Sequence, residues 1–283
     1  LFTTTTFAGP LVAGTNDELD AIVQEVRGRR VSVPERLELL ARLSDKLAEM
    51  EPGGALPSGL YGAVTTEASD PDLSLRRLAT TVLGLIGDDR CLNYFRQKAA
   101  DETDYEVRRK VVEALGRYPG EEPAELIGRL VFDTWKSEDY RLRELALNSW
   151  KKTGGSPSAL AARAVALLEE DPYPSVRQAA AEARRGLENI RGRYDFYGRI
   201  YEVYRREPEL EVRGALLAVL GFVGLPEALP ILSEARREPG LFRAAVEGLG
   251  FLDDQESRRL DTDELVVAAA YVDEGPTIKR WRA

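Results

Sequence analysis

The chain has 283 residues, a formal net charge of −9 and no histidine. The negative charge argues against broad binding to duplex nucleic acid or to an anionic membrane, because both need a basic contact surface, although a local basic patch is compatible with it. Without histidine the chain has no Ser-His-Asp or Cys-His nucleophile, no imidazole acid–base chemistry and no ordinary zinc site.

Further classes of protein are excluded by motifs that the chain lacks. It has no GxGxxG or GxxxxGK[ST] phosphate loop, so we expect no nucleotide cofactor, and we expect no metal. The hydrophobic fraction of 43% is that of a globular protein, and no apolar run approaches the about 18 residues of a membrane span. The single cysteine, Cys91, excludes an intramolecular disulfide, and we expect it to be a buried thiol. We expect the protein to be cytoplasmic. Because the first residue is Leu1 and not Met, a processed N-terminus stays an alternative.

Residues 1–54 are predicted to form an N-terminal arm and capping helices. The threonine-rich residues 1–15 favour an extended arm or a short strand. A helix is expected over residues 16–27, and Pro34 starts a second one, whose leucines recur every three or four residues. Pro52-Gly53-Gly54 then breaks the chain.

From residue 55 to residue 252 one pattern recurs, and its best copy is the segment 104–116. The equivalent positions are Arg76, Arg108, Arg143, Arg177, Arg213 and Phe242. They are 32, 35, 34, 36 and 29 residues apart, and a period of this size is typical of a solenoid built from stacked repeats.

Each copy is predicted to be a helical hairpin. In the first helix Val107, Val111 and Leu115 recur every four residues and so share one helix face. Acidic residues and prolines mark the helix starts. A glycine stands eight residues after the reference position in four copies, where either a left-handed helix end or a close backbone approach would require it: Gly84, Gly116, Gly221 and Gly250. The second helices are expected at residues 88–100, 121–136, 157–170, 193–206 and 226–237.

Two segments, 70–77 and 220–232, resemble HEAT repeats of the phycobilisome-lyase-like subtype. The resemblance covers roughly residues 55–252 and implies an all-α fold, a right-handed α-solenoid of about six HEAT-like hairpins between N- and C-terminal capping helices. It says little about function, because the class includes adaptors, assembly factors, a few enzymes and bilin lyases. The sequence departs from the pattern at Phe242, Trp150, Lys151, Arg184 and Arg185, so copies three and four are expected to be irregular.

Residues 253–283 are predicted to form a C-terminal cap. The apolar segment 263–272 is expected to be a last helix that seals the final core, and Gly275-Pro276 ends it. The basic tail around Trp281 is expected to fold its indole onto the last repeat.

The recurring arginine lines up along one edge of a stacked array. Such a ladder can bind phosphates, but in HEAT-like arrays the arginine is expected to pair with acidic residues at the helix starts. The acidic residues in question are Asp72, Asp104, Asp139 and Glu209.

A tyrosine stripe and a local excess of arginine mark the segment 193–206. The candidate partner-binding residues there are Arg193, Tyr194, Tyr197, Arg199, Tyr201, Tyr204 and Arg205. The four tyrosines share one helix face, while Phe196, Ile200 and Val203 supply a separate apolar face for the core. Aromatic rings mixed with arginine suit a peptide, an acidic partner or a single-stranded nucleic acid. The alternative is that the tyrosines pack between repeats with their hydroxyl groups reaching water.

A third cluster, Trp135, Asp139 and Arg143, resembles that of HEAT-like alkylpurine DNA glycosylases. The resemblance implies an aromatic wall at Trp135, a carboxylate at Asp139 that stabilises a cationic sugar, and a phosphate contact at Arg143. Against it, Asp139 and Arg143 also fit ordinary repeat positions, and the net charge does not suit duplex DNA.

The sequence therefore favours a non-enzymatic HEAT-repeat scaffold or adaptor. It is expected to bind a protein or peptide on its concave surface, which the second helices form, or on the Tyr/Arg-rich segment. The alternatives are a nucleic-acid-binding protein of the glycosylase type and a relative of the chromophore lyases.

Overall fold

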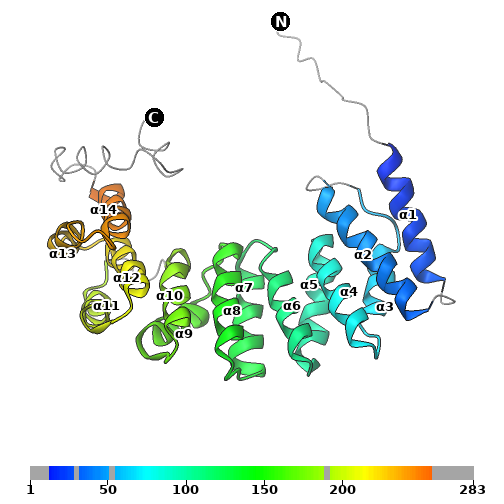
Figure 1. Ribbon diagram of the computed structural model, residues 1–283, viewed down its shortest axis with the longest axis horizontal. Helices are drawn as coiled ribbons and strands as arrows, with labels where there is room; N and C mark the ends of the chain where they lie inside the picture. The colour runs from blue at the N-terminus through cyan, green and yellow to red at the C-terminus, as the bar shows by residue number, and fades with distance from the viewer. Residues whose placement is uncertain (1–12, 29–31, 51–54, 188–191, 257–283) are drawn as a thin grey trace, which may run out of the picture. The chain divides into compact units, whose positions relative to one another are not determined.

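The computed structural model describes residues 13–28, 32–50, 55–187 and 192–256 (Figure 1). These residues form helices and connecting turns, and no strand occurs among them. They divide into two compact units, Leu1–Glu138 and Asp139–Ala283. The expected division into residues 1–54, 55–252 and 253–283 stays a prediction.

The first unit holds seven α-helices within the described residues. They are α1 (Ala13–Arg27), α2 (Val33–Glu49), α3 (Leu60–Glu67), α4 (Leu73–Ile86), α5 (Asp89–Lys98), α6 (Tyr105–Leu115) and α7 (Glu121–Gly128), with a 3₁₀ turn at Ala99–Asp101 and a π-helix at Arg129–Thr134. Helices α2, α4 and α6 pack in succession as one layer. Helices α3 and α5 contact each other, and both contact α4.

The second unit repeats this arrangement. Its helices are α8 (Tyr140–Thr153), α9 (Ser158–Glu170), α10 (Pro174–Glu182), α11 (Tyr194–Arg206), α12 (Leu210–Val223), α13 (Ala228–Ala235) and α14 (Phe242–Glu256), with a 3₁₀ turn at Ala183–Gly186. Helices α8, α10, α12 and α14 pack in succession, and α9, α11 and α13 complete the hairpins. Both units are therefore stacks of helical hairpins, and the α-solenoid expected from the sequence is confirmed.

Helix starts are stabilised locally by the residues that the sequence suggests. Ser32 and Glu35 form a capping box at α2, and the Ser32 backbone N–H donates to the Glu35 carboxylate at 2.8 Å. The side chains of Asp72 and Asp104 accept hydrogen bonds from the first backbone N–H groups of α4 and α6. These local bonds stabilise the starts of α2, α4 and α6.

Two of the recurring glycines allow neighbouring helices to approach closely. A Cβ atom added to Gly84 would lie 2.7 Å from Cβ of Ala114, and one added to Gly221 would collide with the backbone of Gly248. The left-handed helix ends fall three residues later, at Gly87 and Gly224, with φ of 70° and 76°. Of the two roles considered for Gly84 and Gly221, close approach is the one that the structure supports.

Copies three and four are irregular, as expected. Trp150 stands where other copies have leucine; its side chain is buried, and its indole N–H donates to the Gly155 carbonyl at 2.8 Å. The ring lies so close to Gly186 that a Cβ atom there would collide with it. Helix α10 accordingly ends early, in the 3₁₀ turn at Ala183–Gly186.

Several expected features lie outside the described residues. They are most of the N-terminal arm, the helix at 263–272 and the basic tail with Trp281. The expected C-terminal cap therefore stays a prediction.

Substitution of Val107 by Asp tests the assigned core face of the repeat helices. Val107 is 3% exposed in the middle of its unit, so Val107→Asp buries an unpaired charge and should lower the free energy of unfolding by about 2–5 kcal/mol. Leu73→Asp is the matched control, because Leu73 is 40% exposed and its substitution should change stability by less than about 1 kcal/mol. Urea denaturation measures both; equal effects would show that the helix face is misassigned.

Candidate functional site

Two arginines of the ladder are paired with buried carboxylates of the same unit. Arg143 donates to both oxygens of Asp171 at 2.8 and 3.1 Å, and Arg177 donates to both oxygens of Glu207 at 2.8 Å. The side chains of Asp171 and Glu207 are only 2% and 3% exposed. Such bidentate, desolvated pairs hold one repeat to the next and leave the guanidinium group little capacity for phosphate.

The acidic partners are not the ones expected. Arg76, Arg143 and Arg177 pair with Glu102, Asp171 and Glu207. Glu102 and Glu207 each stand two residues before a helix-start position, Asp104 or Glu209. The arginine of one repeat meets the turn before the next repeat helix, where the acid two residues ahead of the helix start is within reach. Asp104 caps α6 and pairs instead with the neighbouring Arg77 at 3.1 Å.

The ladder also begins earlier than the sequence period indicated. Arg36 of α2 donates to Glu67 and to Asp70 at 2.8 Å each. It precedes Arg76 by 40 residues, a spacing outside the regular interval, which is why the sequence analysis missed it. Helix α2 is thus joined to the repeats by the same kind of ion pair.

Each residue of the cluster Trp135, Asp139 and Arg143 has a contact within the chain. The Arg108 guanidinium lies over the Trp135 ring at 5.1 Å. Asp139 caps α8 by accepting from the Arg141 backbone N–H at 2.8 Å. Arg143 is 11% exposed and is held by Asp171. The proposed phosphate contact therefore already has a carboxylate partner.

Helix α11 separates the two faces that the sequence distinguished. Phe196, Ile200 and Val203 are buried and attach the helix to its unit. The predicted tyrosines follow the adjoining face, and most of the arginines lie on the solvent side. The tyrosines do not, however, share one environment.

Three of the tyrosines are half-buried, and two of them, Tyr197 and Tyr204, contact neighbouring elements. The Tyr197 hydroxyl donates to the Glu227 carbonyl at 2.7 Å, and its ring stacks on Tyr201 with centroids 6.3 Å apart. Burial raises the pKa of Tyr197 to about 12, and Glu227 and Tyr201 add to the effect. The Arg213 guanidinium lies 5.3 Å from the Tyr204 ring. Tyr204 thus connects α11 to α12 and Tyr197 connects it to the segment before α13, so part of the stripe is packing.

Tyr194 differs from the other three. Its side chain is 63% exposed, the largest value among the exposed large hydrophobic residues described. Arg193 pairs with Asp195 at 2.6 Å, and Arg205 lies over Tyr201 at 5.8 Å. These arginines are also solvent-exposed, so the exposed part of the predicted site gathers on one side of α11.

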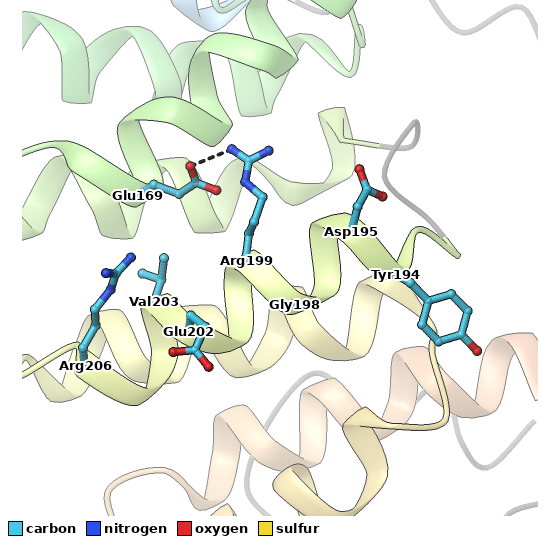
Figure 2. Close-up of a pocket in the computed structure, with 8 residues that line it drawn as sticks. All are labelled: Glu169, Tyr194, Asp195, Gly198, Arg199, Glu202, Val203 and Arg206. Atoms are coloured by element: carbon cyan, nitrogen blue, oxygen red, sulfur yellow. Dashed lines mark hydrogen bonds and ion pairs between the residues drawn. The ribbon is translucent and has the colours of Figure 1, made fainter.

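A shallow groove of about 450 Å³ runs along this side of α11 (Figure 2). It is lined by Glu169, Tyr194, Asp195, Gly198, Arg199, Glu202, Val203 and Arg206. Arg199 donates to Glu169 of α9 at 2.6 Å across it, and this hydrogen bond raises the pKa of Arg199. We refer to these eight residues as the α11 groove.

The groove contains residues that the sequence analysis did not select. Glu169, Gly198 and Arg206 belong to it, while Tyr197, Tyr201 and Tyr204 lie outside it. The repeat period could have pointed to Glu169, because Glu169 and Arg199 are 30 residues apart, as are Arg177 and Glu207.

In the described part of the chain no group of three or more Cys, Asp or Glu residues is placed to hold a metal ion, and no helix is long and apolar enough to cross a membrane.

Comparison with known proteins agrees with the repeat period. Residues 63–131 match the family model of HEAT repeats. The chain contains HEAT repeats. The matched residues include α4 to α7, together with the Arg76–Glu102 pair and the contact between Gly84 and Ala114.

Other comparisons are more distant or more local. Large ribosomal subunit protein uL22 of Acidothermus cellulolyticus is 64% identical over 28 residues, and the chain thus spans about a tenth of that curated relative. The structure of the complex of CpcE and CpcF of phycocyanin lyase from Nostoc sp. PCC7120 is 18% identical with a TM-score of 0.42, covering 96% of this chain and 98% of that one. Neither likeness is close enough to transfer a function.

The role of the ladder can be tested at Asp171. Asp171→Asn leaves the buried Arg143 guanidinium without its countercharge and should lower the free energy of unfolding by about 3 kcal/mol. Asp195→Asn removes a carboxylate from an exposed pair with Arg193, so its denaturation midpoint should match that of the wild type. An unchanged midpoint in Asp171→Asn would mean that Arg143 does not depend on this carboxylate.

Proposed function

We propose that this protein is a non-catalytic HEAT-repeat scaffold that binds a protein or peptide partner through the exposed side of α11. The observation that carries the proposal is Tyr194, which is 63% exposed at the start of a helix rich in solvent-facing arginine. Exposed aromatic rings and arginines are the side chains that contribute most to protein–protein interfaces.

Helix α11 is held on both sides before any partner binds. Arg199 fixes it to Glu169 of α9, and Tyr197 fixes it to the carbonyl of Glu227 just before α13. A partner therefore meets a surface whose backbone is already ordered, which lowers the entropic cost of association.

The charge of this helix supports an acidic partner. From Arg193 to Arg206 the segment carries four arginines and two carboxylates, in a chain whose net charge is −9. A positive patch on a negative molecule orients an acidic partner during encounter and accelerates association at low salt.

The glycosylase alternative fits the structure less well. Arg143 is committed to Asp171, and Asp139 accepts a hydrogen bond from the first turn of α8. The chromophore-lyase alternative rests on the resemblance of the repeats alone. A binding scaffold needs only the exposed side chains that α11 presents.

The scaffold function can be tested by crosslinking. A photo-crosslinking amino acid at position 194 should capture a partner that mass spectrometry identifies, and calorimetry with the purified partner should then show weaker binding to Arg193→Gln/Arg205→Gln. We expect about a 10-fold loss at about 50 mM salt and a smaller loss at about 300 mM salt, because exposed charges are screened.

Arg117→Gln/Arg237→Gln is the matched control. It removes the same charge from exposed positions outside α11, and its affinity should fall much less. If the two double variants lose affinity equally, the effect is one of net charge and the proposed surface is wrong.

The enzymatic alternative has its own test. The wild type should release no base from alkylated duplex DNA, and Asp139→Asn should only lower stability, by about 0.5–2 kcal/mol, because the cap of α8 weakens. Base release by the wild type that is lost in Asp139→Asn at an unchanged melting temperature would replace the scaffold by an enzyme.

A further inference from the structure

We infer that the partner presents an extended acidic segment that lies in the α11 groove, crossing Gly198 between Tyr194 and Arg206. This inference rests on the proposed function and specifies the chemistry of the partner at that site. It follows from the row of side chains along the helix, from the ion pairs around it and from the open space above Gly198.

Gly198 stands in the interior of a 13-residue helix, where glycine is less favourable than alanine. No packing contact demands it, because a Cβ atom added there would meet nothing within 4 Å. The position is exposed and lines the groove. What the missing side chain provides is room for another chain to approach the helix backbone.

One ridge of the helix runs through the groove. Tyr194, Gly198, Glu202 and Arg206 are spaced four residues apart and therefore lie in one row, with Tyr194 and Arg206 at its ends (Figure 2). Twelve residues of α-helix rise by about 18 Å, which an extended chain covers in about five to six residues. The length of the row thus sets the spacing, along the partner, between the group that contacts Tyr194 and the group that contacts Arg206.

The ion pairs decide the sign of the partner's charge. Each groove carboxylate has its own arginine, since Asp195 pairs with Arg193, Glu202 with Arg205 and Glu169 with Arg199. Among the described residues none forms an ion pair with Arg206, which is exposed. Counted together with Arg193 and Arg205, which lie beside the groove, four arginines face three carboxylates, and Arg206 is the cation left over. An Asp or Glu side chain is its complement.

The other end of the row calls for an apolar group. The Tyr194 ring is 63% exposed and contacts no other ring or cation in the described part of the chain. Burying such a ring under an aromatic or aliphatic side chain is favourable, and the hydroxyl can still reach water. The segment thus carries an apolar residue followed or preceded by carboxylates at a distance of about five residues.

Fluorescent peptides can test this spacing. The probes are labelled Gly/Ser-based peptides of about twelve residues with one Trp and two adjacent Glu, placed about two, five or eight residues apart, and a Lys version of the middle one. Anisotropy should show the tightest binding for the spacing of about five and no binding for the Lys version. Equal binding at all spacings, or preference for Lys, would overturn the inference.

Filling the groove separates binding from folding. Gly198→Gln places a side chain in the path of the peptide and should weaken binding at least about 10-fold. The same change should raise the melting temperature by about 1–3 °C, because glycine is removed from a helix. If the variant binds the peptide more weakly but melts at a higher temperature, the helix is still folded. The loss of affinity would then come from the blocked groove.

Gly62→Gln is the matched control for this substitution. Gly62 is also an exposed helical glycine whose added Cβ atom would meet nothing within 4 Å, but it lies in α3. It should leave peptide affinity unchanged. Arg206→Gln should also weaken the peptide about 10-fold, and Arg237→Gln, which removes an exposed arginine elsewhere, should not.

The outcomes distinguish this inference from the scaffold function. If the crosslinked partner binds through Arg193 and Arg205 but Gly198→Gln and Arg206→Gln bind it as the wild type does, the scaffold stands and the acidic segment in the groove is wrong. If neither the partner nor any peptide depends on a residue of α11, both are wrong.

Discussion

The structure depends on buried ion pairs between successive repeats. A single helical hairpin cannot bury its apolar face, so the repeats must stack. At two steps of the second unit an arginine is largely withdrawn from water together with a carboxylate of a following turn. The pairs Arg143–Asp171 and Arg177–Glu207 are almost fully desolvated and bidentate. Apolar contacts alone would allow neighbouring helices to slide, whereas a bidentate pair is favourable only in one register.

This constraint also decides where binding can take place. Because Arg143 and Arg177 are neutralised by nearly buried carboxylates, they offer a partner little charge. In the second unit the charge available to a partner comes from α11, whose arginines are exposed and whose ion pairs are mostly made at the surface. The paired ladder arginines therefore contribute to stability, and it is the arginines of α11 that we propose for recognition.

Helix α11 combines features that rarely serve folding alone. It keeps an open glycine at position 198, an exposed tyrosine at 194 and an arginine at 206 that has no ion pair among the described residues. The glycine lowers the stability of the helix, and the tyrosine and the arginine make few stabilising contacts. Phe196 and Ile200 supply the packing that keeps the helix in place. Such local departures from optimal stability are common where a surface is selected for binding.

The sequence by itself determined the helical hairpins, their period and the two faces of α11, because helical periodicity and helix starts depend on residues a few positions apart. It also indicated that the ladder arginines pair with acids. Only the tertiary structure decided which acids those are, that Tyr197 binds the Glu227 carbonyl while Tyr194 stays exposed, and that Glu169 completes the groove. These contacts join residues about 30 positions apart, and their partners depend on how closely helices approach at Gly84, Gly221 and Trp150, which local pattern does not specify.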